Sequence, residues 1–198
     1  AWQYLWLVPQ DLEKLVECFG GVEQTIEKLD GLFTADTKME GEDVTPDISG
    51  LIGQYVHGNE PSHHIIYFYT MLGEPWKAAD RLYEVMATMY STEPDGLSGN
   101  EDVGQMSAWY VMTTLGFYPV EPASGKYVLG VPMVDGAEID VEGGIFRVER
   151  LGYSEANRYV QSVELNGVAL DRNYITHEEV IAGGLLKFNM GAEKSVWY

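Results

Sequence analysis

The chain of 198 residues is long enough for one large domain or two small ones, and with 45% hydrophobic residues it can form a buried core. Its 31 acidic and 12 basic residues give a formal charge of −19, which argues against binding to nucleic acid or to an anionic membrane surface, because both require Lys and Arg. The sequence contains no run of about 18 apolar residues, so no membrane-spanning helix is expected. No signal peptide is expected either.

The first part of the chain has helical periodicity. Apolar residues recur at the i, i+3, i+4, i+7 spacing of one helix face until Gly20-Gly21, where the helix is expected to end. The residues of this face are Leu12, Leu15, Val16 and Phe19. Cys18 is the single cysteine, so the chain cannot form an internal disulfide, and its apolar neighbours predict a buried thiol rather than a nucleophile.

Three further helices are expected in the following stretch. One begins at Val22, carries its apolar face to Phe33 and leads into a polar, acidic loop over residues 34–48. A short helix is expected after Pro61. Another begins at Pro75, because the first turn of a helix tolerates proline, and its apolar face runs from Trp76 to Tyr90.

The chain changes character near Pro119. Before it, a turn-rich loop over residues 91–105 leads into a last helix that ends at Gly116. After it, the apolar period shifts to two, in short segments rich in Val, Ile, Tyr and Phe that are separated by Gly and Asn turns. Helices followed by strands predict an α+β fold, with a helical part over 1–118 and a small antiparallel, sandwich-like β region over 119–198.

Polar clusters fall between the predicted helices, in loops of the kind that usually carry functional sites. In "GNEDVGQ", Glu101 and Asp102 are adjacent, with Asn100 and Gln105 close by. Neighbouring carboxylates repel each other, so either one of them has a raised pKa or a cation neutralises both, and hard cations bind such oxygen ligands. A solvated acidic turn is the simpler explanation of the same residues.

Three histidines occur in "YVHGNEPSHH" without the CxxC or HExxH spacing of zinc sites. His63 and His64 are consecutive at a predicted helix start, so their side chains diverge by about 100° and at most one points into a site. Trp2, with Tyr4 and Trp6, is either a stacking wall for a sugar or part of an aromatic core.

Several long motifs follow one another along the chain. They are "WQYLWLVPQD" at the start, "GNEPSHH" at 58–64, "DGLSGNEDVGQMSAWYV" at 95–111, "LGFYPV" at 115–120, and "YVLGVPM" and "YVQSVELNG" in the β half. Together they resemble the C-terminal portion of glycoside hydrolase family 92, the calcium-dependent exo-α-mannosidases. The resemblance implies that the chain consists of the last helices of an (α/α)6 barrel and the small β region that follows it.

The resemblance also implies hydrolysis of α-mannosides with inversion, which needs a general acid and a general base on opposite sides of the sugar. Asp102 is the best match to the base, and backbone amides at the start of the next helix are expected to hold its carboxylate ionised. Asn100 stands where some members carry a second acid, so a paired-carboxylate base is not expected there. Glu101 is the weaker candidate for the base, and Val103 stands where a cysteine or small polar residue is expected.

"GNEPSHH" resembles the stretch that contributes to the metal and mannose subsite of the family. By that resemblance, Asn59 and Glu60 are the expected ligands of Ca²⁺, which would hold the 2- and 3-hydroxyls of mannose and favour a distorted ring. The expected substrate-binding residues are His57, Glu60, His63, Trp2 and Gln105.

The general acid of the family, a glutamate, is expected just upstream of "AWQY". The chain alone is therefore expected to be inactive or nearly so, with a mannose-containing glycan and the N-terminal segments of a parent enzyme as its partners. Two alternatives are a non-catalytic carbohydrate-binding or interaction module and a different helical-barrel glycosidase or phosphorylase. The acidic composition suits a secreted, periplasmic or cell-surface bacterial protein, although many cytoplasmic proteins are acidic too.

Overall fold

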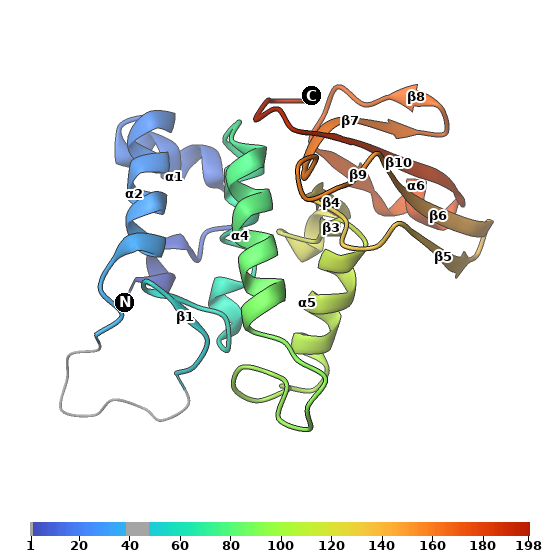
Figure 1. Ribbon diagram of the computed structural model, residues 1–198. Coiled ribbons are helices and arrows are strands. Elements are labelled where there is room, and N and C mark those ends of the chain that lie inside the picture. The colour runs from blue at the N-terminus through green and yellow to red at the C-terminus, as the bar shows by residue number, and fades with distance from the viewer. Residues whose placement is uncertain (1, 39–47) are drawn as a thin grey trace. The chain divides into compact units, whose positions relative to one another are not determined.

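The computed structural model describes residues 2–38 and 48–198 (Figure 1). Two compact units make up the chain: unit 1 comprises Ala1–Ile66 and Tyr83–Trp109, and unit 2 comprises Tyr67–Leu82 and Tyr110–Tyr198. Helices α4 (Pro75–Thr88) and α5 (Gln105–Thr114) each contribute residues to both units. Within the described ranges, no helix has the length and apolar character needed to cross a membrane.

Unit 1 is mainly helical. Its other elements are η1 (Gln3–Trp6), α1 (Leu12–Phe19), α2 (Val22–Thr34), the paired strands β1 (Leu51–Ile52) and β2 (Tyr55–Val56), and η2 (Glu60–Ser62). Asp11 caps α1 by accepting the Lys14 amide at 3.0 Å, and Gly20 ends this helix with a φ of 95°. Both helices predicted from the apolar period are present. The loop predicted over 34–48 includes residues 39–47, which lie outside the described residues.

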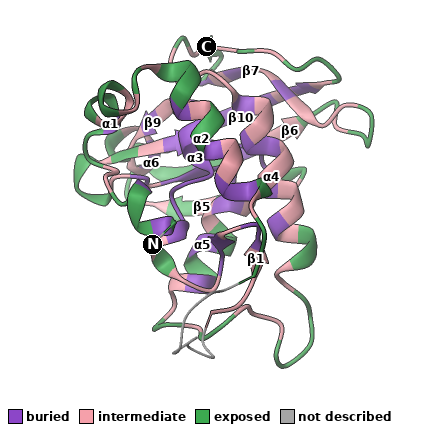
Figure 2. Cartoon of the chain, turned by 90° about the vertical axis from the view of Figure 1, so that its left-hand side faces the viewer, coloured by how far each residue is buried: buried purple, intermediate pink, exposed green. Residues whose placement is uncertain are grey.

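The exposure of α1 corrects one prediction. Figure 2 shows that α1 is largely exposed, and Leu12 is its one buried residue. Cys18 is exposed, so it is not the buried thiol that its apolar neighbours predicted. The reason is angular: Cys18 lies six positions after Leu12 and therefore about 240° away around the helix axis.

The segment after Pro61 is less helical than the sequence predicts. The backbone amides of Ser62, His63 and Ile65 bond to carbonyls three residues back, which gives tight turns instead of an α-helix. Regular α-helix begins later, as α3 (Tyr67–Met71), which belongs to unit 2. The predicted helix is therefore reduced to its second half.

Unit 2 contains most of the strands, as the change of period near Pro119 predicts. One sheet has the order β3-β4-β9, and a five-stranded sheet has the order β5-β6-β10-β7-β8 (Figure 1). The elements are β3 (Phe117–Tyr118), η3 (Pro122–Ser124), β4 (Lys126–Leu129), β5 (Gly136–Val141), β6 (Gly144–Leu151), β7 (Tyr159–Leu165), β8 (Val168–Ala169), β9 (Tyr174–Thr176), α6 (His177–Ile181) and β10 (Gly184–Gly191).

One strand pairing departs from the antiparallel arrangement predicted for the β region. β10 is antiparallel to β7 but parallel to β6, with Gly184 beside Phe146 and Asn189 beside Leu151. A parallel pair needs a long crossover connection, and β7, β8, β9 and α6 all lie between these two strands in the chain. The β region is therefore mixed, although its other pairings are antiparallel in the described residues.

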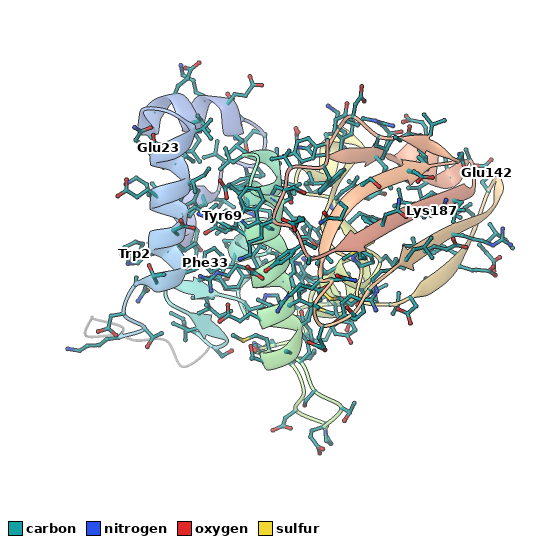
Figure 3. The ribbon with its side chains drawn as sticks, turned by 45° about the horizontal axis from the view of Figure 1, so that its top comes forward. Trp2, Glu23, Phe33, Tyr69, Glu142 and Lys187 are labelled. Carbon is teal, nitrogen blue, oxygen red and sulfur yellow. The ribbon has the colours of Figure 1, made fainter. Side chains whose placement is uncertain are left out.

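The five-stranded sheet shows the alternation expected of strands with one buried face. Along β10, Leu186, Phe188 and Met190 are buried, while the residues between them are half-buried. Lys187, labelled in Figure 3, pairs with Glu164 of the neighbouring strand β7 at 3.1 Å. Helices in the first half and mixed strands in the second make this an α+β protein. The (α/α)6 barrel and the domain division at residue 118 stay predictions.

Candidate active site

Two loops of unit 1 meet at a pair of glycines. Gly58 of "GNEPSHH" lies against Ser98 and Gly99, which precede "NED" in the other loop. A Cβ atom on Gly58 would come within 2.8 Å of the Ser49 Oγ and 3.0 Å of the Ser98 carbonyl oxygen, so no side chain fits there. The missing side chain lets the two motifs singled out in the sequence lie side by side.

His57 is fully buried, and both of its ring nitrogens are engaged. Nδ1 lies 2.9 Å from the Tyr55 hydroxyl, and Nε2 lies 2.6 Å from the Tyr90 hydroxyl. The Tyr90 hydroxyl donates to the Met106 carbonyl at 3.3 Å, so it accepts from Nε2–H of His57, and Nδ1 accepts from Tyr55. Burial, followed by repulsion from His63, lowers the pKa of His57 from 6.5 to about 3, so the ring is neutral.

His63 is also buried and neutral. Its Nε2 donates to the His57 carbonyl at 2.9 Å, so Nδ1 accepts from the Gln105 amide at 3.0 Å. The His63 carbonyl accepts from the Trp109 indole at 3.0 Å. Burial lowers the pKa of His63 to about 4, although the hydrogen bond to His57 opposes the shift. A buried histidine therefore orients Gln105, one of the predicted substrate ligands.

The two adjacent carboxylates of "GNED" have different surroundings. Glu101 accepts the backbone amides of Gly104 and of Ser107, the latter at 3.1 Å, and so caps the start of α5. The Ser107 hydroxyl and amide, together with the Gly104 amide, lower the pKa of Glu101 below 4.5 against the opposing effect of burial. These amides were expected to hold Asp102. The helix start instead engages Glu101.

Asp102 is exposed and reaches Glu60 of the other loop. Its carboxyl group lies within hydrogen-bonding reach of that of Glu60. This interaction, then partial desolvation, then the charges of Glu60 and Glu101 raise the pKa of Asp102 above its ordinary value, while His63 opposes the shift. A cation beside the two carboxyl groups would relieve the repulsion between them.

The backbone at Asp102 is strained. Asp102 and Val103 both lie in the left-handed region, with φ of 52° and 57°. Such a conformation is uncommon for any residue with a side chain and is an outlier for a β-branched one, at a cost of about 1–3 kcal/mol each. Val103 is fully exposed, so packing of its side chain does not account for the conformation. Strain of this kind is typical of functional loops.

The N-terminal segment lies beside the loop that carries Glu60. η1 packs against η2, and the Trp6 carbonyl accepts from Nε2 of His64 at 2.8 Å. Trp6 is buried, whereas Trp2 at the N-cap of η1 is 46% exposed (Figure 3). The aromatic residues of this segment are therefore divided between a core position and an exposed ring on the element that adjoins Glu60.

Most of the predicted site residues are connected through direct contacts. His57 bonds to His63, His63 bonds to Gln105, and the side chain of Asp102 lies beside that of Glu60. Asn59 is half-buried and directly precedes Glu60, and Asn100 is exposed and lies two residues before Asp102. His57 has a supporting position, because contact with a sugar would require one of its ring nitrogens to lose its hydrogen bond to Tyr55 or Tyr90.

Sequence reasoning did not identify three aromatic residues of this cluster: Tyr55, Tyr90 and Trp109. Tyr90 fits the apolar face of the helix that precedes it, so its ring was considered and the hydrogen bonds of its hydroxyl group were not. The available signal was chemical, because buried Tyr and Trp side chains usually need a partner for their polar atom. The histidine motif was the obvious place to look for those partners.

The Glu60–Asp102 pair has the donor chemistry that a hard cation needs. Asn59 adds an amide oxygen next to Glu60 in the chain, and a cation would relieve the repulsion that raises the pKa of Asp102. In the described part of the chain, no three side chains of His, Cys, Asp or Glu are grouped closely enough to hold a metal ion. Further ligands would be amide, backbone carbonyl or water oxygens, all of which suit Ca²⁺.

Comparison with protein families identifies the chain. The model of the glycosyl hydrolase family 92 catalytic domain matches residues 1–192. The chain belongs to glycosyl hydrolase family 92. The resemblance drawn from the sequence motifs is therefore confirmed.

Solved family 92 structures share this fold. A family 92 α-mannosidase from Bacteroides thetaiotaomicron, in complex with mannoimidazole, matches with a TM-score of 0.87 and 38% identity, covering 97% of this chain and 25% of that one. An inverting family 92 mannosidase of the same organism gives a TM-score of 0.81 and 35% identity, covering 97% of this chain and 27% of that one.

A curated relative is also a glycosidase. An uncharacterised secreted glycosidase of Arthroderma benhamiae is 28% identical over 200 residues, which are 99% of this chain and 24% of that protein. The family 92 chain described here thus spans about a quarter of the length of the relatives it matches.

Proposed function

We propose that this chain is the C-terminal portion of an inverting, calcium-dependent exo-α-mannosidase, and that Asp102 is the general base. Family membership and the α-mannosidases among the structural relatives support this reaction class. The observation that carries the assignment is the contrast between the two carboxylates of "GNED". Glu101 is engaged by the start of α5, whereas Asp102 is exposed and paired with Glu60 of the facing loop.

The surroundings of Asp102 suit a general base. Inverting glycosidases use one carboxylate to activate a water molecule on the face of the sugar opposite the leaving group. Asp102 is an exposed carboxylate that no backbone amide engages among the residues the structure describes, so it is available to accept the proton of that water. The strained backbone at Asp102 and Val103 fixes the direction of the carboxylate, and the buried histidine cluster supports the facing loop.

We propose that Asn59 and Glu60 hold Ca²⁺ through their side-chain oxygens. When bound, the ion would supply positive charge that orients the mannose 2- and 3-hydroxyls and favours a distorted ring. A second consequence concerns Asp102, because neutralising the charge of Glu60 favours the ionised form of its partner, which is the form that accepts a proton. Glu60 thus joins the two parts of the proposed site.

The remaining substrate contacts are proposed for Gln105 and Trp2, while His63, whose ring nitrogens bond to the His57 carbonyl and to Gln105, is proposed to support the site. Gln105 is oriented by Nδ1 of His63, so its amide is held in one direction relative to the loop of Asp102. Trp2 offers an exposed ring on the segment that packs beside η2, where an aromatic face can stack on a sugar. His57 contributes by supporting His63.

The proposed partners are a mannose-containing glycan and the N-terminal segments of the parent enzyme, which would supply the general acid. We propose a secreted or cell-surface location, and the secreted glycosidase among the relatives supports it.

The test is hydrolysis of an aryl α-mannoside by the full-length protein that contains this chain, followed by proton NMR. We expect release of mannose with the β-anomer as the first product, because inversion changes the configuration at the anomeric carbon. The α-anomer as first product would contradict inversion. Binding of mannosides without any release would favour a non-catalytic carbohydrate-binding module instead.

A further inference from the structure

Tyr90 lies where the loop that carries Asp102 leaves α4. It forms an antiparallel bridge with Leu97, and the Ser91 amide donates to the Gly96 carbonyl at 3.0 Å. The Ser98 hydroxyl donates back to the Met89 carbonyl at 3.4 Å. These contacts are made by Met89, Tyr90 and Ser91, and they join the first half of the loop to the end of α4.

The side chain of Tyr90 reaches the other end of the same loop. Its hydroxyl donates to the carbonyl of Met106, the second residue of α5, at 3.3 Å. Asp102 lies between these two anchored ends. One phenol thus joins the exit from α4 to the entry into α5 and sets the span that the loop must cover.

The phenol is itself held in place from two sides. Nε2–H of His57 donates to its oxygen at 2.6 Å, and its ring is parallel to that of Trp109, with an angle of 1° and centroids 6.0 Å apart. His57 accepts in turn from Tyr55 at 2.9 Å. Each hydroxyl and each ring nitrogen in this series has a partner of the right kind, so the hydrogen bonds run in one direction from Tyr55 to Met106.

We propose that Tyr90 is a positioning residue for the general base, acting through Met106 on the loop that holds Asp102; this inference rests on the proposed function. A general base must lie within about 2.6–3.2 Å of the water it activates. Displacement of a catalytic group by about 1 Å can lower the rate 100-fold. A loop with two strained residues just before α5 needs fixed ends, and Tyr90 contacts both ends.

The test is the variant Tyr90→Phe in the full-length protein. It removes the hydroxyl but keeps the ring against Trp109. We expect kcat on an aryl α-mannoside to fall about tenfold or more, while KM changes less than about threefold, because the base is misplaced and the ground-state sugar contacts are not. We also expect faster amide hydrogen exchange in residues 91–104, measured by mass spectrometry.

Tyr67→Phe is the matched control. Its buried hydroxyl bonds Thr113 at 2.8 Å within unit 2, so the variant also loses one buried hydrogen bond. We expect it to lower the melting temperature while kcat and the exchange of residues 91–104 stay as in the unmodified protein. A merely structural role for Tyr90 would make the two variants behave alike.

His57→Gln and His57→Leu provide a second, independent pair. The glutamine amide can still donate to the Tyr90 hydroxyl, whereas leucine cannot, so we expect His57→Gln to keep several-fold more of kcat. If His57 acts through Tyr90, the double variant His57→Leu/Tyr90→Phe is no slower than the slower single variant. Fully additive losses in kcat would overturn this coupling. This pair also decides the proposal if Tyr90→Phe does not fold.

The outcomes separate this proposal from the assignment of function. Unchanged exchange in residues 91–104 of Tyr90→Phe overturns the proposal whether or not the protein is active. Faster exchange with unchanged kcat overturns it as well, because the loop then moves without consequence for the base. If the unmodified protein hydrolyses no α-mannoside, the proposed function fails, and the exchange measurement still decides whether Tyr90 holds the loop.

Discussion

The carboxyl group of Asp102 lies within hydrogen-bonding reach of that of Glu60, and the two residues come from different loops of unit 1. Their charges repel each other, and a cation beside the pair would relieve that repulsion. This relationship makes the proposed base and the proposed metal ligand one electrostatic unit. A change at either residue is therefore expected to affect the other.

Asp102→Asn tests the assignment of the base. Asparagine keeps the shape and the hydrogen-bonding ability of the side chain but cannot accept the proton of water. We expect kcat on an aryl α-mannoside to fall by roughly 10²–10⁴-fold, with a smaller change in KM. Steady-state kinetics at neutral pH would measure both constants.

Glu101→Gln is the control for that experiment, because it alters the neighbouring carboxylate. The glutamine oxygen can still accept the Gly104 or Ser107 amide, so the cap of α5 is weakened but kept. We expect kcat to change less than about threefold. A nearly normal kcat in Asp102→Asn, or a large loss in Glu101→Gln, would reverse the assignment within "GNED".

Removal of calcium tests the proposed ligands. We expect treatment with EDTA to abolish the α-mannosidase activity of the full-length protein and added Ca²⁺ to restore it. Calcium should also raise the melting temperature, because an ion that binds the folded state alone stabilises it. Glu60→Gln is expected to require a higher Ca²⁺ concentration for both effects. Full activity after exhaustive chelation would exclude the calcium role.

The buried histidines predict how the stability of the chain depends on pH. Folding lowers the pKa of His57 to about 3 and that of His63 to about 4, from 6.5 for both. The unfolded chain therefore binds protons below about pH 6.5 that the folded chain does not bind, so stability is complete above this pH and is lost as the pH falls from there toward 4. Between pH 7 and 5.5, the free energy of unfolding should drop by about 2–3 kcal/mol for the two residues.

Urea denaturation at several pH values would measure this dependence. The chosen window lies above the range in which most carboxylates titrate, so their contribution is small there. His57→Gln is expected to remove part of the slope, even though it is less stable at pH 7; the rest comes from His63 and from His64, whose pKa burial also lowers. A constant free energy of unfolding from pH 7 to 5.5 would show that the histidines are not buried in neutral form.

Local patterns of the sequence predicted the helices and strands better than they predicted which strands pair. The apolar face that begins at Leu12 and the glycine at position 20 predicted the bounds of α1, because both are properties of neighbouring residues. The parallel pairing of β6 with β10 left no such mark, since it depends on contacts between strands far apart in the chain. The burial of Cys18 was predicted wrongly because its neighbours in sequence lie on other sides of the helix.

The same division holds for the candidate site. The motifs identified Glu60 and Asp102 as parts of a site, but that their side chains lie beside each other is seen only when the two loops are folded together. Glu101 and Asp102 are chemically alike and adjacent, and only the backbone geometry before α5 shows which of them caps the helix. Tyr90 was assigned to an apolar face because the apolar period records its ring and not its hydroxyl group.

Val103→Gly tests whether strain in the loop serves catalysis. Val103 is fully exposed in the left-handed region, so glycine relieves the strain, although it also increases the entropy of the unfolded chain. The strain of about 1–3 kcal/mol exceeds that entropic effect of about 0.4–1 kcal/mol, and we expect the free energy of unfolding to rise by about 1 kcal/mol. Because the loop becomes more flexible beside Asp102, kcat is expected to fall several-fold.

Val168→Gly is the matched control. Val168 is also exposed but lies outside the left-handed region, so this change should lower stability and leave kcat unchanged. A destabilised Val103→Gly with normal kcat would show that the conformation has no functional role.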